Sequence, residues 1–208
     1  LKIMSELATK NGDKDKVKKY DKMATKCKSS FESKFYNKRR KCLYDVLGDS
    51  KIRPNQLFSL SLSYPVIDPS SEIANDIIST VEKKLLTPYG LKTLAKGEEG
   101  YKESYEGDMV KRDMSYHQGT IWPWLLGLYY DALGNMIKSE KKKSIKQELE
   151  KKKQEFKEEV RKTFVQEMNE NSTVGNIREL YSKIGKDYKP DGTFAQAWSV
   201  SEIFRIIL

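Results

Sequence analysis

The sequence has 208 residues, enough for one medium-sized domain with a sizeable hydrophobic core. Its formal net charge is +9, but the lysine excess is interleaved with glutamate in helical stretches, which is typical of a solvated surface. No zinc-finger spacing or aromatic RNA-binding motif accompanies the charge, so we expect no nucleic-acid partner. No run of about 18 apolar residues occurs, so we expect no membrane partner either.

Cysteine and histidine are scarce in this chain. Cys27 and Cys42 are too few for a disulfide scaffold, and we expect both to be reduced in a cytoplasmic protein. With one histidine, His117, we expect neither a metal nor a cofactor. Leu1 is not an initiator methionine and no helix cap stands before the first apolar stripe, so we expect the chain to belong to a longer protein.

Apolar residues at helical spacing dominate the chain and predict about seven helices. Asp13 precedes a long apolar stripe and is expected to cap the second helix. Asp68 followed by Pro69 predicts another helix start, and Gly134 predicts a helix end. The helices are predicted over residues 1–11, 13–36, 54–64, 69–86, 123–133, 136–168 and 193–208.

Two long polar segments, residues 87–117 and 171–192, are predicted to be loops, because glycines and tyrosines replace the helical pattern there. Strand signals are weak, so the predicted fold class is all-α. Buried and amphipathic helices alternate, which predicts two layers with the long loops around one central mouth. The inner helices would be 54–64, 122–133 and 194–208, and the outer helices 13–36, 69–86 and 138–168.

The stretch over residues 112–126 gathers polar side chains just before an apolar helix. His117 and Gln118 come first, and two tryptophans then flank Pro123, a residue tolerated in the first turn of a helix. Aromatic walls with a few polar groups suit a ligand that has both polar and apolar faces, such as a sugar. The alternative is an ordinary loop that enters a buried helix.

Acidic residues in the predicted loops are candidates for chemistry on a sugar. Cleavage of a glycosidic bond needs two carboxyl groups, which stand about 6.5–9.5 Å apart in an inverting mechanism. Because Arg178 precedes Glu179, we expect the pKa of that carboxyl to be low, as a general base requires. The alternative for Glu179 is an exposed loop glutamate. The candidate acids are Asp108, Asp113, Glu179 and Asp191.

A series of short motifs follows in order along most of residues 45–205. They include Ile-Arg-Pro-Asn-Gln-Leu (52–57), Leu-Leu-Thr-Pro-Tyr-Gly-Leu (85–91), Tyr-His-Gln-Gly-Thr-Ile-Trp-Pro-Trp (116–124), Glu-Leu (179–180) and Ala-Gln-Ala-Trp-Ser-Val (195–200). Together they resemble the C-terminal part of the glucosidase domain of glycogen debranching enzymes, the amylo-α-1,6-glucosidase family. One such motif would be a weak signal, but the ordered set is specific.

The resemblance implies an all-α (α/α)6 toroid, of which residues 1–208 would be roughly the C-terminal half. It implies hydrolysis, with inversion, of α-1,6-linked glucosyl stubs on a limit dextrin, and a branched α-glucan such as glycogen as partner. The family's general base falls on Glu179. The family's general acid belongs to a Trp-Met-Asp-Ala type motif that is absent here, so we expect the isolated chain to be inactive.

The substrate-binding residues are expected around the same mouth. His117 and Gln118 would contact sugar hydroxyls, and Trp122 and Tyr89 would stack on sugar faces, although each is also a credible packing residue. The Ser-Lys-Ile-Gly segment after Tyr181 departs from the family pattern. The expected set is His117, Gln118, Trp122, Tyr89, Arg53, Gln56 and Asp113; the last could instead pair with Arg112 to fix the loop.

Two other functions stay open at this point. One is another (α/α)6 glycosidase, of the glucoamylase or trehalase type, which shares the architecture and the two-carboxylate chemistry. The other is a glycan-binding module without catalysis, which the missing acid motif favours if this chain acts alone. Half a toroid would also expose apolar surface, so self-association of the chain is expected.

Overall fold

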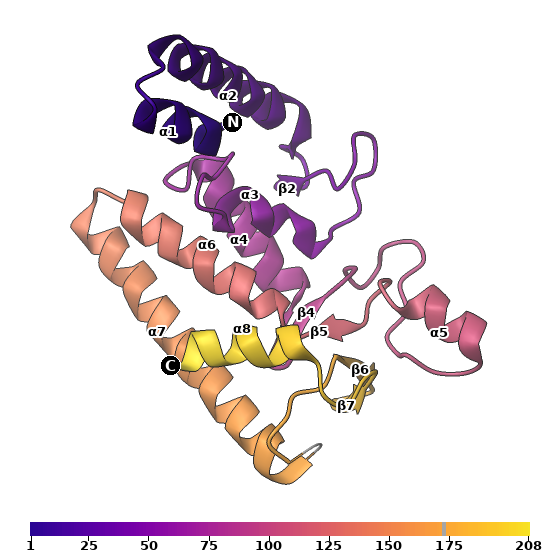
Figure 1. Cartoon of the computed structure of the whole chain (residues 1–208). Helices are drawn as coiled ribbons and strands as arrows, with labels where there is room; N and C mark the ends of the chain where they lie inside the picture. The colour runs from indigo at the N-terminus through magenta and orange to yellow at the C-terminus, as the bar shows by residue number, and fades with distance from the viewer. Residues whose placement is uncertain (172–173) are drawn as a thin grey trace.

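The computed structural model describes residues 1–171 and 174–208, and it combines helices with two small sheets (Figure 1). The chain starts with a helical hairpin of α1 and α2, and it ends with α8, which packs against α6 and α7. The helices are α1 (Lys2–Lys10), α2 (Lys14–Phe35), α3 (Phe58–Ser61), α4 (Glu72–Lys84), α5 (Met109–Ser115), α6 (Leu125–Ser139), α7 (Lys143–Gln166) and α8 (Ala197–Ile207), with a 3-10 turn η1 (Pro54–Leu57) and a π-helical turn η2 (Glu167–Asn171).

The strands form two antiparallel sheets, so the predicted all-α half-toroid is wrong. One sheet pairs β1 with β2, and the other has the order β3-β4-β5-β6-β7. The chain therefore runs through the larger sheet as a meander: two-residue turns join β3 to β4 and β6 to β7, whereas α5 lies between β4 and β5, and α6 and α7 lie between β5 and β6. The strands are β1 (Tyr36–Asn37), β2 (Cys42–Leu43), β3 (Leu86–Thr87), β4 (Gly90–Lys92), β5 (Ile121–Trp122), β6 (Leu180–Ile184) and β7 (Asp187–Asp191).

The longest strand pair is the β6–β7 hairpin, which lies where a polar loop was predicted. Gly185 occupies the first of its two turn positions with φ +59°, a conformation that glycine adopts without strain. Pro190 of β7 pairs with Tyr181 of β6. β7 is an edge strand, so no further strand needs a hydrogen bond from the N–H that proline lacks. The rest of the predicted loop over 171–192 is irregular where the structure describes it; residues 172 and 173 lie outside the described part.

The other predicted loop, residues 87–117, is also wrong as a structureless connection. It contributes to β3, β4 and the short helix α5, which projects from one side of the molecule (Figure 1). Leu91 of β4 pairs with Trp122 of β5, so the loop returns to the strand that precedes α6. Gly90 has φ +151°, and a Cβ there would lie 2.4 Å from the Trp122 carbonyl oxygen. The close strand approach therefore requires glycine.

Helix boundaries agree with the sequence at some ends and differ at others. Asp13 caps α2 as predicted, because its Oδ1 accepts a hydrogen bond from the Lys16 N–H at 3.0 Å. Ser71, not Asp68, caps α4; its Oγ accepts from the Ala74 N–H at 3.2 Å. The carboxylate of Asp68 instead accepts from the Ser70 N–H at 2.9 Å, one turn earlier.

The predicted helix end at Gly134 is wrong, since α6 continues to Ser139 and α7 starts only at Lys143. Asn135 follows the glycine, and its side-chain amide donates to the Leu60 and Leu62 carbonyl oxygens at 2.8 and 3.1 Å. This amide therefore satisfies carbonyl groups at the end of α3 rather than capping its own helix.

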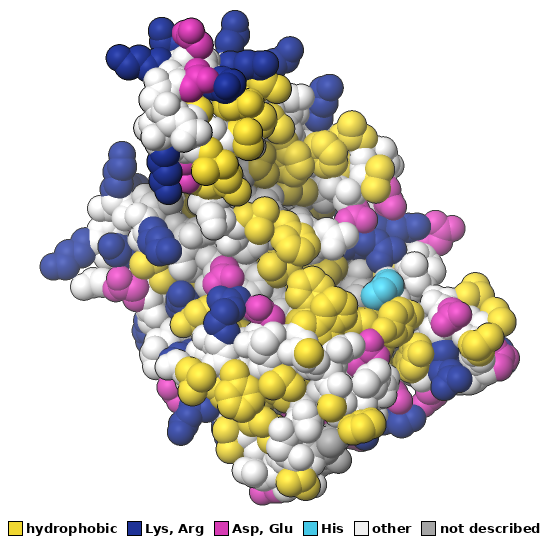
Figure 2. All heavy atoms as spheres, in the orientation of Figure 1, with side chains coloured by type: hydrophobic (Ala, Val, Ile, Leu, Met, Phe, Trp, Pro, Cys, Tyr) yellow, Lys and Arg dark blue, Asp and Glu magenta, His cyan; other side chains and the backbone are white. Residues whose placement is uncertain are grey.

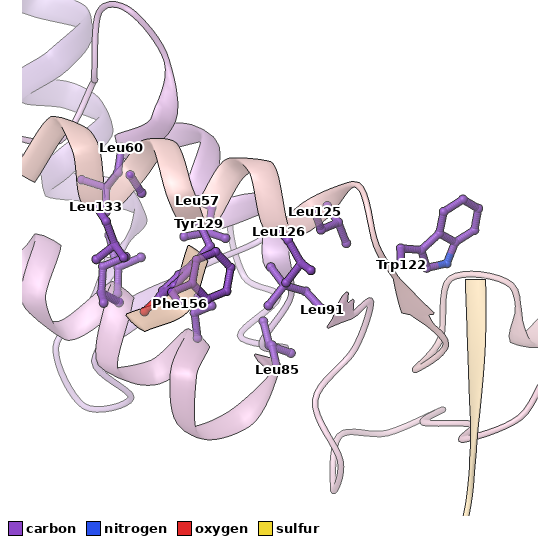
Figure 3. Close-up of a cluster of buried hydrophobic side chains, with 14 of the residues drawn as sticks. Leu57, Leu60, Leu85, Leu91, Trp122, Leu125, Leu126, Tyr129, Leu133 and Phe156 are labelled. Carbon is purple, nitrogen blue, oxygen red and sulfur yellow. The ribbon is translucent and has the colours of Figure 1, made fainter. Parts of the chain in front are cut away.

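α6 is the centre of the hydrophobic core. Leu126, Tyr129 and Leu133 are buried along one side of it and meet side chains from α3, α4, β4 and α7 (Figure 3). Trp122 lies beyond the N-terminal end of this row, with its ring directed away from it. The core thus fixes β5 and the start of α6, and this junction carries the polar stretch singled out from the sequence.

None of the residues of α2, which was predicted to be an outer helix, is buried, and α8, which was predicted to be an inner helix, is only partly buried. α8 buries Ser199, Ile203 and Ile206, yet Trp198 is 45% exposed. Hydrophobic side chains form a band across the face shown in Figure 2, and His117 lies beside it. Within the described residues, no helix combines the length and the apolar character that crossing a bilayer requires.

Candidate active site

Glu179 lies just before β6 and is 7% exposed. Its Oε1 accepts hydrogen bonds from the Tyr116 hydroxyl and, at 3.1 Å, from the Gln196 side-chain amide. Its Oε2 accepts from the Thr193 N–H at 2.9 Å. Burial raises the pKa of Glu179, but these hydrogen bonds together outweigh burial, and the pKa lies below its ordinary value. The carboxyl is therefore ionised at neutral pH.

The β6–β7 hairpin holds this carboxylate in place. The Glu179 N–H donates to the Thr193 carbonyl oxygen at 2.9 Å, so the residues that flank the hairpin are themselves paired. Gly192 has φ +68°, and a Cβ there would lie 2.6 Å from Oε2 of Glu179. Only glycine allows the backbone to turn this close to the carboxylate.

Tyr116 connects Glu179 to an aromatic cluster at the start of α6. Its ring meets the Trp122 ring edge-on at 4.9 Å and lies 4.6 Å from the His117 ring. Burial and the neighbouring Glu179 charge raise the pKa of the Tyr116 hydroxyl, so it remains a donor to the carboxylate. Trp122 is 2% exposed, and its indole N–H donates to the Tyr116 carbonyl oxygen at 3.2 Å.

His117 is exposed at the same cluster, with its ring 5.1 Å from that of Trp122. Burial of part of the ring lowers the pKa of His117, as does the charge of Arg53, while Glu179 acts in the opposite direction. The net shift is downward, so the imidazole is neutral at neutral pH. A neutral imidazole both donates and accepts hydrogen bonds, as recognition of a hydroxyl group requires.

A hollow of about 210 Å³ opens beside this cluster. Three indole rings contribute to its lining, and its polar edge carries a guanidinium, an amide and an imidazole. Such a mixture of flat apolar surface and few polar groups suits a sugar ring. The lining residues are Arg53, Pro54, Asn55, Thr93, His117, Trp122, Trp124, Leu125 and Trp198.

Arg53 braces the rim of the hollow. Its guanidinium donates to the Thr93 and His117 carbonyl oxygens at 3.1 and 2.8 Å and to the Gln118 Oε1 at 2.9 Å. The side-chain oxygen of Gln118 therefore already accepts a hydrogen bond from Arg53. Gln56 is 6% exposed, and its amide donates to the Arg53 carbonyl oxygen at 2.9 Å, so it fixes the backbone that carries the Arg53 side chain.

Two expected substrate contacts lie elsewhere. The Tyr89 ring lies 4.7 Å from the Tyr181 ring of β6 and 5.1 Å from the Tyr188 ring of β7, so it belongs to a tyrosine cluster at these two strands. Asp113 is an exposed residue of α5, and within the described residues no ion pair joins it to Arg112. The structure therefore brings neither residue to the hollow beside Trp122.

The other candidate acids have structural hydrogen bonds. Asp108 caps α5, where its Oδ1 accepts from the Lys111 N–H at 2.9 Å. Asp191 ends β7, and its Oδ2 accepts from the Ser182 hydroxyl at 2.6 Å. Neither contact joins these carboxyl groups to Glu179.

Several neighbours of the site were not selected from the sequence. Gln196 and Thr193 hold Glu179, and Trp124 and Trp198 line the hollow. Gln196 and Trp198 belong to the Ala-Gln-Ala-Trp-Ser-Val motif, which was the signal available for them. Thr193 acts through its backbone N–H, and no side-chain pattern can reveal that.

Glu179 does not line the hollow itself, but Tyr116 links its ionised, buried carboxylate to the Trp122 ring in the hollow's lining. A carboxylate and an aromatic hollow connected in this way form a site of the type that glycosidases use. The chain matches the model of the amylo-alpha-1,6-glucosidase family over residues 1–205 and belongs to that family. It is therefore a glycosidase-related domain, and the predicted resemblance is confirmed. No match was found among curated proteins.

Among solved structures, the chain is similar to one titled "Sialidase", with a TM-score of 0.67 and 15% sequence identity. The similarity covers 99% of this chain and 18% of that one. At this identity the similarity shows the fold alone. The chain spans less than a fifth of the length of the structure that it matches.

Proposed function

We propose that this domain contributes the general base for hydrolysis of α-1,6-linked glucosyl stubs on a branched α-glucan. The proposal depends mainly on Glu179, a buried carboxylate kept ionised by three donors, one of which, Tyr116, contacts the Trp122 ring of the aromatic hollow. Membership of the amylo-alpha-1,6-glucosidase family supports the substrate class.

In the proposed reaction, Glu179 accepts a proton from a water molecule as that water attacks the anomeric carbon. The water approaches from the face opposite the leaving oxygen, so the configuration inverts and an α-glucosidic bond yields β-glucose. The proton lost by water stays on Glu179. A general acid supplies a proton to the leaving oxygen, so the two protonation changes balance.

We propose that the general acid comes from a segment other than residues 1–208. The described contacts of Glu179 are with a phenol, an amide and a backbone N–H, and Asp108 and Asp191 are engaged in structural hydrogen bonds. Residues 1–208 alone are then expected to release no glucose from a limit dextrin.

The hollow would bind the glucosyl unit. Trp124 and Trp198 would offer apolar surface beside the buried Trp122, and His117 would offer hydrogen bonds to hydroxyl groups. Gln118, whose Oε1 accepts from Arg53, would contact hydroxyl groups from the rim. Arg53 and Gln56 fix the rim on which these groups stand. Their role in this proposal is positioning.

The test replaces Glu179 by Gln in the full-length protein and measures glucose release from a phosphorylase limit dextrin. Glu179→Gln keeps the shape but removes the base, so the rate is expected to fall by about 10²–10⁴-fold with substrate binding retained. His117→Ala is the companion variant and is expected to weaken binding as well. Near-normal turnover by Glu179→Gln would contradict the proposal.

A further inference from the structure

A pair of stacked tryptophans lies at the outer edge of the candidate site. The Trp124 and Trp198 rings are 5.3 Å apart and inclined by 23°. Trp198 also meets the buried Trp122 ring edge-on at 5.7 Å, so it extends the aromatic wall outward. It is 45% exposed although an indole ring is a large apolar surface, so part of the ring is free to contact a ligand.

The aromatic surface continues past this pair. Phe58 is 38% exposed, and its ring lies 6.4 Å from that of Trp124. Beyond Phe58 is a second hollow of about 280 Å³, and the two hollows share Asn55 in their linings. The second is lined by Phe31, Phe35, Leu43, Tyr44, Asp45, Asn55, Gln56, Phe58, Ser59, Leu62 and Val66.

Polar groups border the aromatic surface where the two hollows meet. The Asn55 amide donates to Oδ1 of Asp45 at 2.8 Å, and the Arg53 guanidinium lies 3.7 Å from Oδ2 of the same carboxylate. Planar side chains held by one another offer hydrogen bonds at fixed positions beside flat rings. This combination matches the alternating apolar faces and hydroxyl rims of a pyranose chain.

We propose that Trp124, Trp198 and Phe58 form an aromatic ledge that binds the α-glucan chain carrying the stub. The ledge is continuous with the glucosyl hollow, so a chain whose terminal unit occupies that hollow would lie across the indole pair and reach the second hollow. This inference depends on the proposed function for the substrate class, but its binding test does not depend on catalysis.

The experiment measures maltohexaose binding to the full-length protein by calorimetry. Trp198→Ala is expected to weaken binding about tenfold, the size of an aromatic contact of this kind. Trp198→Phe keeps a ring and is expected to restore most of the affinity. The matched control is Phe204→Ala, because Phe204 is on the same helix and 37% exposed but lines neither hollow; it is expected to bind like the unchanged protein.

Kinetics give a second readout. Trp198→Ala is expected to raise KM for limit dextrin about tenfold more than KM for α-glucosyl fluoride, which carries no glucan chain. Unchanged maltohexaose affinity in Trp198→Ala, or an equal loss in Phe204→Ala, would overturn the ledge. Glu179→Gln separates the two proposals. Near-normal hydrolysis by that variant would contradict the role of Glu179 as the base, whereas its affinity for maltohexaose still tests the ledge.

Discussion

At the scale of single residues, the state of Glu179 follows from two opposing effects. Burial disfavours a charged carboxylate, whereas donors from a phenol, an amide and a backbone N–H favour it. The three donors outweigh the burial because hydrogen bonds to a charged group are the strong ones. Tyr116 follows α5, whereas Thr193 and Gln196 lie in the connection between β7 and α8, so the ionised state depends on two segments that are far apart in sequence.

Gly192→Ala tests whether the turn next to Glu179 positions the carboxylate. The new Cβ would lie 2.6 Å from Oε2 of Glu179, in a left-handed conformation that costs a residue other than glycine about 1–2 kcal/mol. We expect a loss of unfolding free energy of that size and a marked fall in kcat for glucose release.

The control for that variant is Gly185→Ala. Gly185 has φ +59° in the same hairpin, but a Cβ there meets no atom within 4 Å. It should cost similar stability in chemical denaturation while sparing kcat. If both variants reduce kcat equally, the turn acts through general stability and not through the carboxylate.

The sequence identified some site residues and could not identify others. Glu179, His117 and Trp122 were selected from motifs, and the structure places them around one cluster. Tyr89 belongs to a motif too, yet it packs among tyrosines of the sheet, because a motif gives order along the chain and not direction in space. The support from Thr193 is a backbone contact and leaves no trace in residue type.

At the scale of elements, a partly buried polar link joins α4, α6 and α7. The Tyr129 hydroxyl donates to Oε1 of Glu82 on α4 at 2.7 Å, and Lys152 of α7 binds the same oxygen at 2.8 Å. Tyr129 is 2% exposed, and its ring meets Phe156 edge-on at 4.8 Å. α6 therefore holds its neighbours by packing and by one shared carboxylate.

Tyr129→Phe removes only the hydroxyl and is expected to lower the unfolding free energy by about 1.5 kcal/mol, the lower end for a hydrogen bond to a charged group. The lower end applies because Lys152 still satisfies Glu82. Tyr130→Phe is the control, since its hydroxyl forms no hydrogen bond within the described residues. A Tyr129→Phe protein as stable in urea as the Tyr130→Phe protein would contradict the link.

Helices were more predictable than strands for a physical reason. The stripe capped by Asp13 spans 22 residues in α2, so its period is unmistakable. β3, β4 and β5 have two or three residues each, too few for an alternating pattern. In β7, charged residues and Pro190 conceal an edge strand whose pairing is set by its neighbour β6.

At the scale of the whole molecule, the family prediction is confirmed but the all-α toroid is not. The antiparallel sheet of β3–β7 brings residues from segments far apart in sequence to the start of α6, and this is where the site lies. Exposed hydrophobic residues remain on α1, α5 and α8. Self-association of the chain stays a prediction, and sedimentation of the purified protein would test it.

The central claim is that Glu179 is the base of an inverting glycosidase, and azide rescue tests it most directly. Glu179→Ala removes the base and leaves space, so hydrolysis of α-glucosyl fluoride by the full-length protein should fall by about 10²–10⁴-fold. Azide needs no base, so adding it should restore the rate and yield β-glucosyl azide and fluoride. Near-normal hydrolysis by Glu179→Ala without azide, or no β-glucosyl azide with it, would contradict the account.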